Sequence, residues 1–152
     1  MLHSRSNRHR TAALVAAAIL LTVSACDETL SPDGEPAVES MRLVIGSQTV
    51  TVSPSGVTGG PIDLGTGANT VTAFFLGANG LPDPNVSAAA FQLNVQVLGG
   101  APITFQRSAT NPFAGTLTAT AAVQGAQIRF SLFHIEEQHE DFGPFTVTAN
   151  VS

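Results

Sequence analysis

The residues best suited to chemistry lie in one short segment near the end of the chain, "HIEEQHED" at positions 134–141. His134 and His139 are the only histidines beyond residue 9, and four of the eleven acidic residues stand between or beside them. Imidazole together with carboxylate suits Zn²⁺, and imidazole also suits Cu²⁺ and Ni²⁺. A five-residue separation is too long for i, i+4 pairing on a helix, but across a hairpin loop it brings two imidazoles to one ion. The segment therefore predicts a candidate metal site made from His134, Glu136, His139, Glu140 and Asp141.

The same segment has a second interpretation that requires no metal. His134 would then hydrogen-bond locally at the end of the fold, and the acidic residues would keep an apolar hairpin from pairing with a neighbouring chain. The sequence alone leaves both interpretations open.

The other polar residues form no catalytic constellation. The chain has no G-x-S-x-G motif and no lysine, and the "DFG" at 141–143 lacks the Gly-rich loop and catalytic loop that accompany it in kinases. Asp63 and Asp83 stand alone in Gly/Pro-rich segments, where acids commonly cap turns. We therefore expect no enzymatic activity and no organic cofactor.

The elements that must position the two histidines are β-strands. From residue 41 onward apolar and polar residues alternate with a period of two, which is typical of strands with one buried and one solvated face. The same parity continues from Ile128 through Phe130 and Leu132 to His134, so His134 is expected at the loop end of the buried face. The residues predicted to be buried are Met41, Leu43, Ile45, Val50, Val52, Val71, Ala73, Phe75, Phe91, Leu93, Val95, Val97, Ile103, Phe105, Leu117, Ala119, Ala121, Val123, Ile128, Phe130, Leu132, Phe145, Val147, Ala149 and Val151.

Turn-forming segments rich in Gly, Pro, Asn and Asp separate these strands, among them 53–61, 77–85 and 137–144. Seven to eight short strands spaced in this way predict an all-β fold, an antiparallel β-sandwich, with a small β-barrel as the alternative. The layout resembles the immunoglobulin-like domains of bacterial surface proteins. Because the Cys, Trp and Tyr hallmarks of true immunoglobulin domains are missing, the resemblance is one of architecture. The hairpin 127–152 is expected to be central.

Four apolar residues have the opposite parity in their strands: Phe74, Leu76, Phe133 and Ile135. They would form either an exposed apolar strip for a partner protein or a second buried layer.

The first 25 residues have the organisation of an export signal. A basic start, "MLHSRSNRHR", precedes the fifteen-residue apolar run 11–25, which is short for a transmembrane helix. The run ends in Val23-Ser24-Ala25-Cys26, which resembles the lipobox of bacterial lipoproteins, although that family most often has Leu where this chain has Val23. The resemblance implies that a diacylglycerol is attached to Cys26 and that cleavage makes Cys26 the new N-terminus. The alternative is an ordinary secretory signal. Cys26 is the single cysteine of the chain.

The domain organisation follows from these boundaries. Residues 1–25 are expected to be a lipoprotein signal peptide, 26–40 the lipidated cysteine with an acidic flexible linker, and 41–152 the β-sandwich domain. Beyond residue 25 three arginines stand against all eleven acidic residues, a net charge of −8 that disfavours nucleic-acid binding.

These observations predict a non-enzymatic binding or interaction module of the cell envelope, anchored to a membrane through Cys26. Its partner would be an envelope protein, and the protein would be periplasmic or surface-exposed, on either the inner or the outer membrane. The alternative is a lipoprotein that binds Zn²⁺ or Cu²⁺ through the 134–141 loop.

Overall fold

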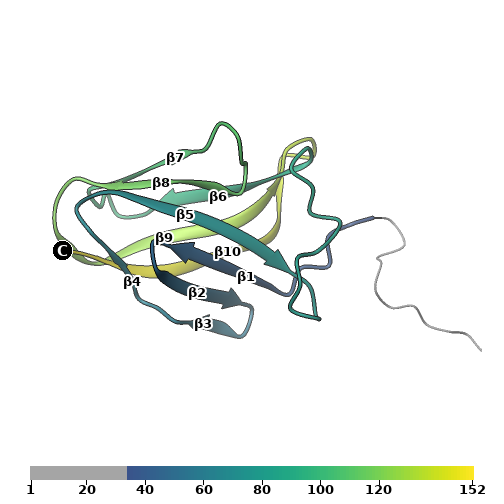
Figure 1. The fold of residues 1–152 in the computed structure, drawn as a ribbon, viewed down its shortest axis with the longest axis horizontal. Helices are drawn as coiled ribbons and strands as arrows, with labels where there is room; N and C mark the ends of the chain where they lie inside the picture. The colour runs from purple at the N-terminus through teal and green to yellow at the C-terminus, as the bar shows by residue number, and fades with distance from the viewer. Residues whose placement is uncertain (1–33) are drawn as a thin grey trace, which may run out of the picture.

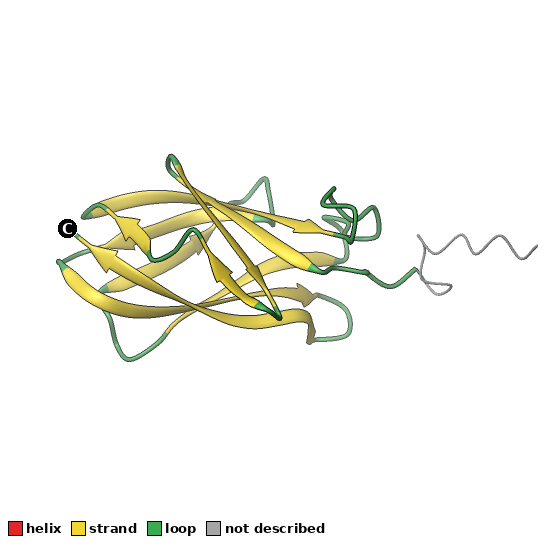
Figure 2. Ribbon diagram, turned by 90° about the horizontal axis from the view of Figure 1, so that it is seen from below, coloured by secondary structure: helices red, strands yellow, loops and turns green. Residues whose placement is uncertain are grey.

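Residues 34–152 fold as a β-sandwich in which every regular element is a strand (Figures 1 and 2). The computed structural model describes residues 34–152. The predicted signal peptide, Cys26 and the first part of the linker lie outside the described residues. The part that is described includes no helix long and apolar enough to cross a membrane.

Ten strands form two sheets. The first sheet has the order β3-β2-β1-β5-β8-β7 and contains β1 (Ser40–Ile45), β2 (Gln48–Ser53), β3 (Gly56–Thr58), β5 (Gly67–Leu76), β7 (Ile103–Arg107) and β8 (Ala114–Ala119). The second has the order β4-β10-β9-β6 and contains β4 (Ile62–Leu64), β6 (Phe91–Val97), β9 (Val123–His134) and β10 (His139–Val151). Neighbouring strands are antiparallel, apart from β4, which runs parallel to the end of β10. The hairpin of β9 and β10 occupies the middle of the second sheet, as predicted.

The alternating pattern correctly identifies most of the core. Its members come from both sheets, and Phe130, Met41 and Leu43 are among the largest side chains that are fully buried. The pattern is wrong at Ala121, which is exposed because β8 ends at Ala119.

Several other predicted core residues are half-buried: Val95, Val97, Phe105, Val123 and Phe145. The first three lie on β6 and β7, which are the edge strands of their sheets, so fewer neighbours cover them.

The strand count and the last turn differ from the sequence-based expectation. β3 lies inside the predicted turn 53–61 and β4 follows it directly, and each has only three residues, too few for a period to be visible. The predicted turn 137–144 is wrong for its second part, because β10 already begins at His139. Irregularities in the pairing with β9, between Glu140 and Phe142 and again before Phe145, let β10 continue through Gly143 and Pro144.

The opposite-parity residues do not form a continuous exposed strip. Phe74 is exposed, with the guanidinium carbon of Arg42 4.9 Å from the centre of its ring. Leu76 is buried, and Phe133 and Ile135 are half-buried.

The segment before β1 is attached to the sandwich although it has no regular structure. Asn85 donates from Nδ2 to the carbonyl of Glu35 at 3.1 Å, and the Glu39 amide donates to the carbonyl of Leu76 at 2.8 Å. Asp83 is buried, and its carboxylate accepts the amide of Ala37 at 2.5 Å and the amide of Asn85 at 2.8 Å. Asp83 therefore caps its own turn, as predicted, and also holds the chain that leads to β1.

Candidate metal centre at the end of the hairpin

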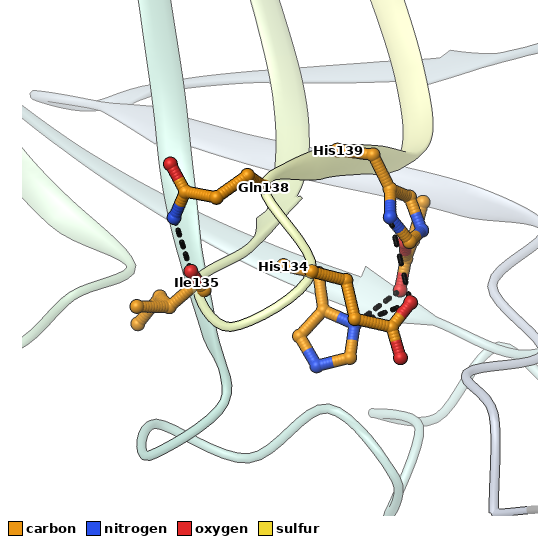
Figure 3. A network of polar contacts seen from close by, with 6 residues as sticks. His134, Ile135, Gln138 and His139 are labelled. Atoms are coloured by element: carbon orange, nitrogen blue, oxygen red, sulfur yellow. Dashed lines mark hydrogen bonds and ion pairs between the residues drawn. The ribbon is translucent and has the colours of Figure 1, made fainter.

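The two histidines face each other across the hairpin of β9 and β10. His134 is the last residue of β9, His139 is the first residue of β10, and the two are direct partners in the ladder. Directly opposed residues project from the same face of a sheet, so their rings come close, with centroids 5.8 Å apart. The turn 135–138 closes through a hydrogen bond from the Gln138 amide to the His134 carbonyl at 3.0 Å. Figure 3 shows a second hydrogen bond in this turn, which Nε2 of Gln138 donates to the carbonyl of Ile135. Gln138 has a φ of 57°, an uncommon conformation for a residue other than glycine.

Glu137 in this turn reaches both imidazoles. Its Oε2 lies 3.6 Å from Nδ1 of His134 and 3.5 Å from Nδ1 of His139. One ligand atom from each of these three residues lies within 4.8 Å of the others. Two ligands of a tetrahedral zinc ion are separated by roughly 3.3–3.5 Å, given metal–ligand bonds of about 2.0–2.2 Å. A small adjustment of side chains would therefore bring all three atoms onto one ion.

Asp141 lies next to both histidines and is mostly withdrawn from solvent. Its Oδ1 is 2.5 Å from Nε2 of His139, and its Oδ2 is 3.7 Å from Nδ1 of His134. The side chain is 13% exposed, against 52% for His139. Oδ1 is buried and accepts no hydrogen bond of good geometry from the described residues. It lies close enough to His139 for an ion pair, but the two groups are not aligned as a hydrogen bond. A buried carboxylate oxygen in this position is stabilised by a nearby cation or by a hydrogen-bond donor.

A third strand fixes the orientation of His134. Phe91, the first residue of β6, pairs with His134 in the ladder, and the two rings lie 4.5 Å apart with a tilt of 33°. His134 is thus held between β6 and β10, which leaves Nδ1 directed toward Glu137 and Asp141.

The structure brings together three of the five residues predicted from sequence, namely His134, His139 and Asp141. Glu136 is exposed and does not join the group, and Glu137 supplies the carboxylate instead. Glu140 follows His139 on the strand and turns toward β9 and β6, where its Oε1 accepts from Ser131 Oγ at 2.8 Å and from Asn94 Nδ2 at 3.2 Å. Glu140 is thus engaged elsewhere, although it borders the same pocket.

A surface pocket of ≈ 460 Å³ opens over these groups. Its wall contains Phe91, both histidines, Glu137, Glu140 and Asp141 and, from outside the hairpin, Gly34, Glu35 and Pro36. No arginine lines it, and every ion pair found within residues 34–152 involves His134 or His139. The four carboxylates around the pocket are therefore not neutralised by arginine.

Two of the residues around the site could not be identified from the sequence. The choice of Glu137 over Glu136 depends on the conformation of the four-residue turn, and no glycine or proline in 135–138 indicates that conformation. Glu35 is nearly a hundred residues away along the chain.

Comparison of the chain with protein-family models, with curated proteins and with solved structures gave no match.

Proposed function

We propose that this protein is a binding module that holds a divalent transition-metal ion, Zn²⁺ in the first place, at the end of its central hairpin. The observation that carries the proposal is the convergence of His134, Glu137 and His139, whose ligand atoms lie within 4.8 Å of one another. Two imidazoles and one carboxylate are a ligand set used for zinc, with a fourth position left for water or another donor.

The surroundings of this centre support the proposal. Asp141 is placed beside the ring nitrogen of His139 that Glu137 does not approach. Histidines that bind a metal through one nitrogen commonly present the other to a carboxylate, which orients the ring and raises its basicity. The cation would also compensate the buried Oδ1 of Asp141.

The burial of Asp141 disfavours the alternative in which the segment is only a charged turn. Acidic residues keep a hairpin from pairing with a neighbouring chain when their charged groups are exposed to solvent. Glu136 satisfies that condition, because it is exposed. Asp141 does not, since it is 13% exposed and faces two imidazoles.

We also propose a cellular location for this protein. We place it in the bacterial cell envelope, attached to a membrane through a lipid on Cys26, and we assign it no catalytic role. The support is the lipobox-like Val23-Ser24-Ala25-Cys26 after a basic and apolar start. An envelope protein as a further partner is part of the same proposal.

Calorimetric titration and thermal unfolding of the purified full chain with Zn²⁺ test the metal proposal. We expect saturable binding at neutral pH, and a stabilisation of about 2.7 kcal/mol once free Zn²⁺ is a hundredfold above Kd. His134→Ala and His139→Ala should each abolish the stabilisation, whereas Asp63→Asn, which removes an exposed acid on β4, should retain it. Binding should weaken in acid, because an imidazole binds a metal only when it is unprotonated. Failure to observe saturable binding of either Zn²⁺ or Cu²⁺ would refute the proposal.

A further inference from the structure

The segment that enters the sandwich from the N-terminal side passes beside the proposed metal centre. Gly34, Glu35 and Pro36 form one wall of the pocket whose other walls carry His134, Glu137, His139 and Asp141. Figure 1 shows this segment and the β9–β10 hairpin at the same end of the molecule. A carboxylate from outside the hairpin thus lines the same pocket as the hairpin residues.

The backbone around Glu35 is held in place. The carbonyl of Glu35 accepts a hydrogen bond from Asn85, and two residues later the amide of Ala37 is bound by the buried carboxylate of Asp83. Pro36 restricts the conformations open to Glu35, because the residue before a proline is confined to extended backbone. The glutamate is therefore presented at the pocket by a fixed stretch of chain, while its side chain stays exposed to solvent.

The charges also favour a cation at this position. Glu35 adds a carboxylate to a pocket that already contains Glu137, Glu140 and Asp141 and no arginine. A cation between these carboxylates would be attracted by each of them, and most strongly by Asp141, which is the least exposed. Of the four, Glu140 is engaged by Ser131 and Asn94, and Asp141 faces His139. Glu35 is the carboxylate of the pocket wall whose side chain makes no hydrogen bond or ion pair within residues 34–152, so it is free to take the position otherwise left to water.

We infer that Glu35 is the fourth ligand of the metal bound by His134, Glu137 and His139, and that the bound metal fastens the N-terminal segment to the end of the sandwich. This inference rests on the proposed metal function. Its consequence is structural: the Glu35 side chain, which is exposed to solvent, would become a further attachment of this segment to the sandwich, besides the hydrogen bonds at the Glu35 carbonyl and the Ala37 amide.

The test compares Zn²⁺ binding by the full chain and by two charge-matched variants, Glu35→Gln and Glu39→Gln. Both variants remove one exposed carboxylate from the same segment, but Glu39 does not line the pocket. Glu35→Gln should weaken Zn²⁺ binding roughly tenfold or more, in the range seen when groups around a metal are removed. Glu39→Gln should change it less than twofold. Unfolding without metal should be the same for both, since neither side chain makes a hydrogen bond among the described residues.

Amide hydrogen exchange supplies the second measurement. Saturating Zn²⁺ should slow exchange at Glu35, Ala37 and Val38 in the natural chain, and this protection should be lost in Glu35→Gln at saturation. Equal affinities for the two variants, or equal losses in both, would overturn the role of Glu35 while leaving the metal centre intact. Absence of Zn²⁺ binding by the natural chain would instead remove the metal centre itself, so the two failures are distinguishable.

Discussion

At the scale of single residues, the feature that most constrains the chemistry is the carboxylate of Asp141. It contacts Nε2 of His139 at 2.5 Å, whereas Glu137 approaches Nδ1 of the same ring. The carboxylates of Asp141 and Glu137 therefore lie beside different nitrogens of the His139 ring. We interpret Glu137 as a ligand and Asp141 as the residue that positions the imidazole.

Asp141→Asn should therefore weaken Zn²⁺ binding by roughly 10- to 100-fold, because the amide keeps the shape but loses the charge that orients and polarises His139. Calorimetric titration at neutral pH measures the change. Glu136→Gln, an exposed acid of the same turn, serves as the control and should leave the affinity unchanged. An affinity in Asp141→Asn equal to that of the control would show that Asp141 does not position the ring.

The sequence places the two histidines and four acids in one segment, but it does not give the full set of residues that the structure brings together there. Two histidines near four acids predict a metal site whichever acids are used. The choice of Glu137 depends on the conformation of the turn. Gln138 has a left-handed backbone conformation there, which the sequence does not indicate. Finding Glu35 and Phe91 requires knowledge of which loops meet at one end of the sandwich, and that depends on strand order.

At the scale of elements, the central hairpin of β9 and β10 both supplies the core and carries the site. The alternation along 127–134 predicts a strand, and the structure confirms it through buried Ile128, Phe130 and Leu132. Residues 124–126 were expected to form a turn, which is wrong, because β9 already begins at Val123. The start of β10 was not visible, because Gly143 and Pro144 are ordinarily signals of a turn. Register shifts in the pairing with β9 accommodate them, and a strand that continues through such shifts shows no regular period.

Phe130→Ala should lower the free energy of unfolding by roughly 3–5 kcal/mol, because the ring is fully buried between the sheets. Phe74→Ala is a suitable comparison, since that ring is 36% exposed and contacts Arg42. It should cost no more than about 1 kcal/mol. Urea denaturation of the two variants measures both values, and equal losses would mean that the face of β9 has been assigned incorrectly.

At the scale of the whole molecule, the architecture was easier to predict than the strand count. Periodicity and turn spacing indicated a sandwich, and the two packed sheets confirm it. The parallel pairing of β4 with β10 joins segments more than eighty residues apart, and local pattern contains no information about such contacts.

The proposed anchor gives a prediction at the same scale. Cells that express the natural chain and are fed a fatty-acid analogue should yield a labelled protein of reduced length, because acylation and cleavage occur together at Cys26. Cys26→Ser should remain unlabelled and unprocessed, and the labelled protein should sediment with membranes. Recovery of a mature, unacylated and freely soluble form of the natural chain would contradict the anchor.

The position of the chain ends has a consequence for how the molecule can be used. The C-terminus lies at the end of the sandwich opposite to the hairpin and the N-terminal segment (Figure 1). Ser152 is tied into that end by hydrogen bonds with Leu64 and Thr66. A polypeptide fused after Ser152 would start at a fixed point, separated from the pocket beside His134 and His139 by the length of the strands. If the N-terminal side is held at a bilayer, such a passenger would project outward, and the domain would serve as a rigid spacer for surface display.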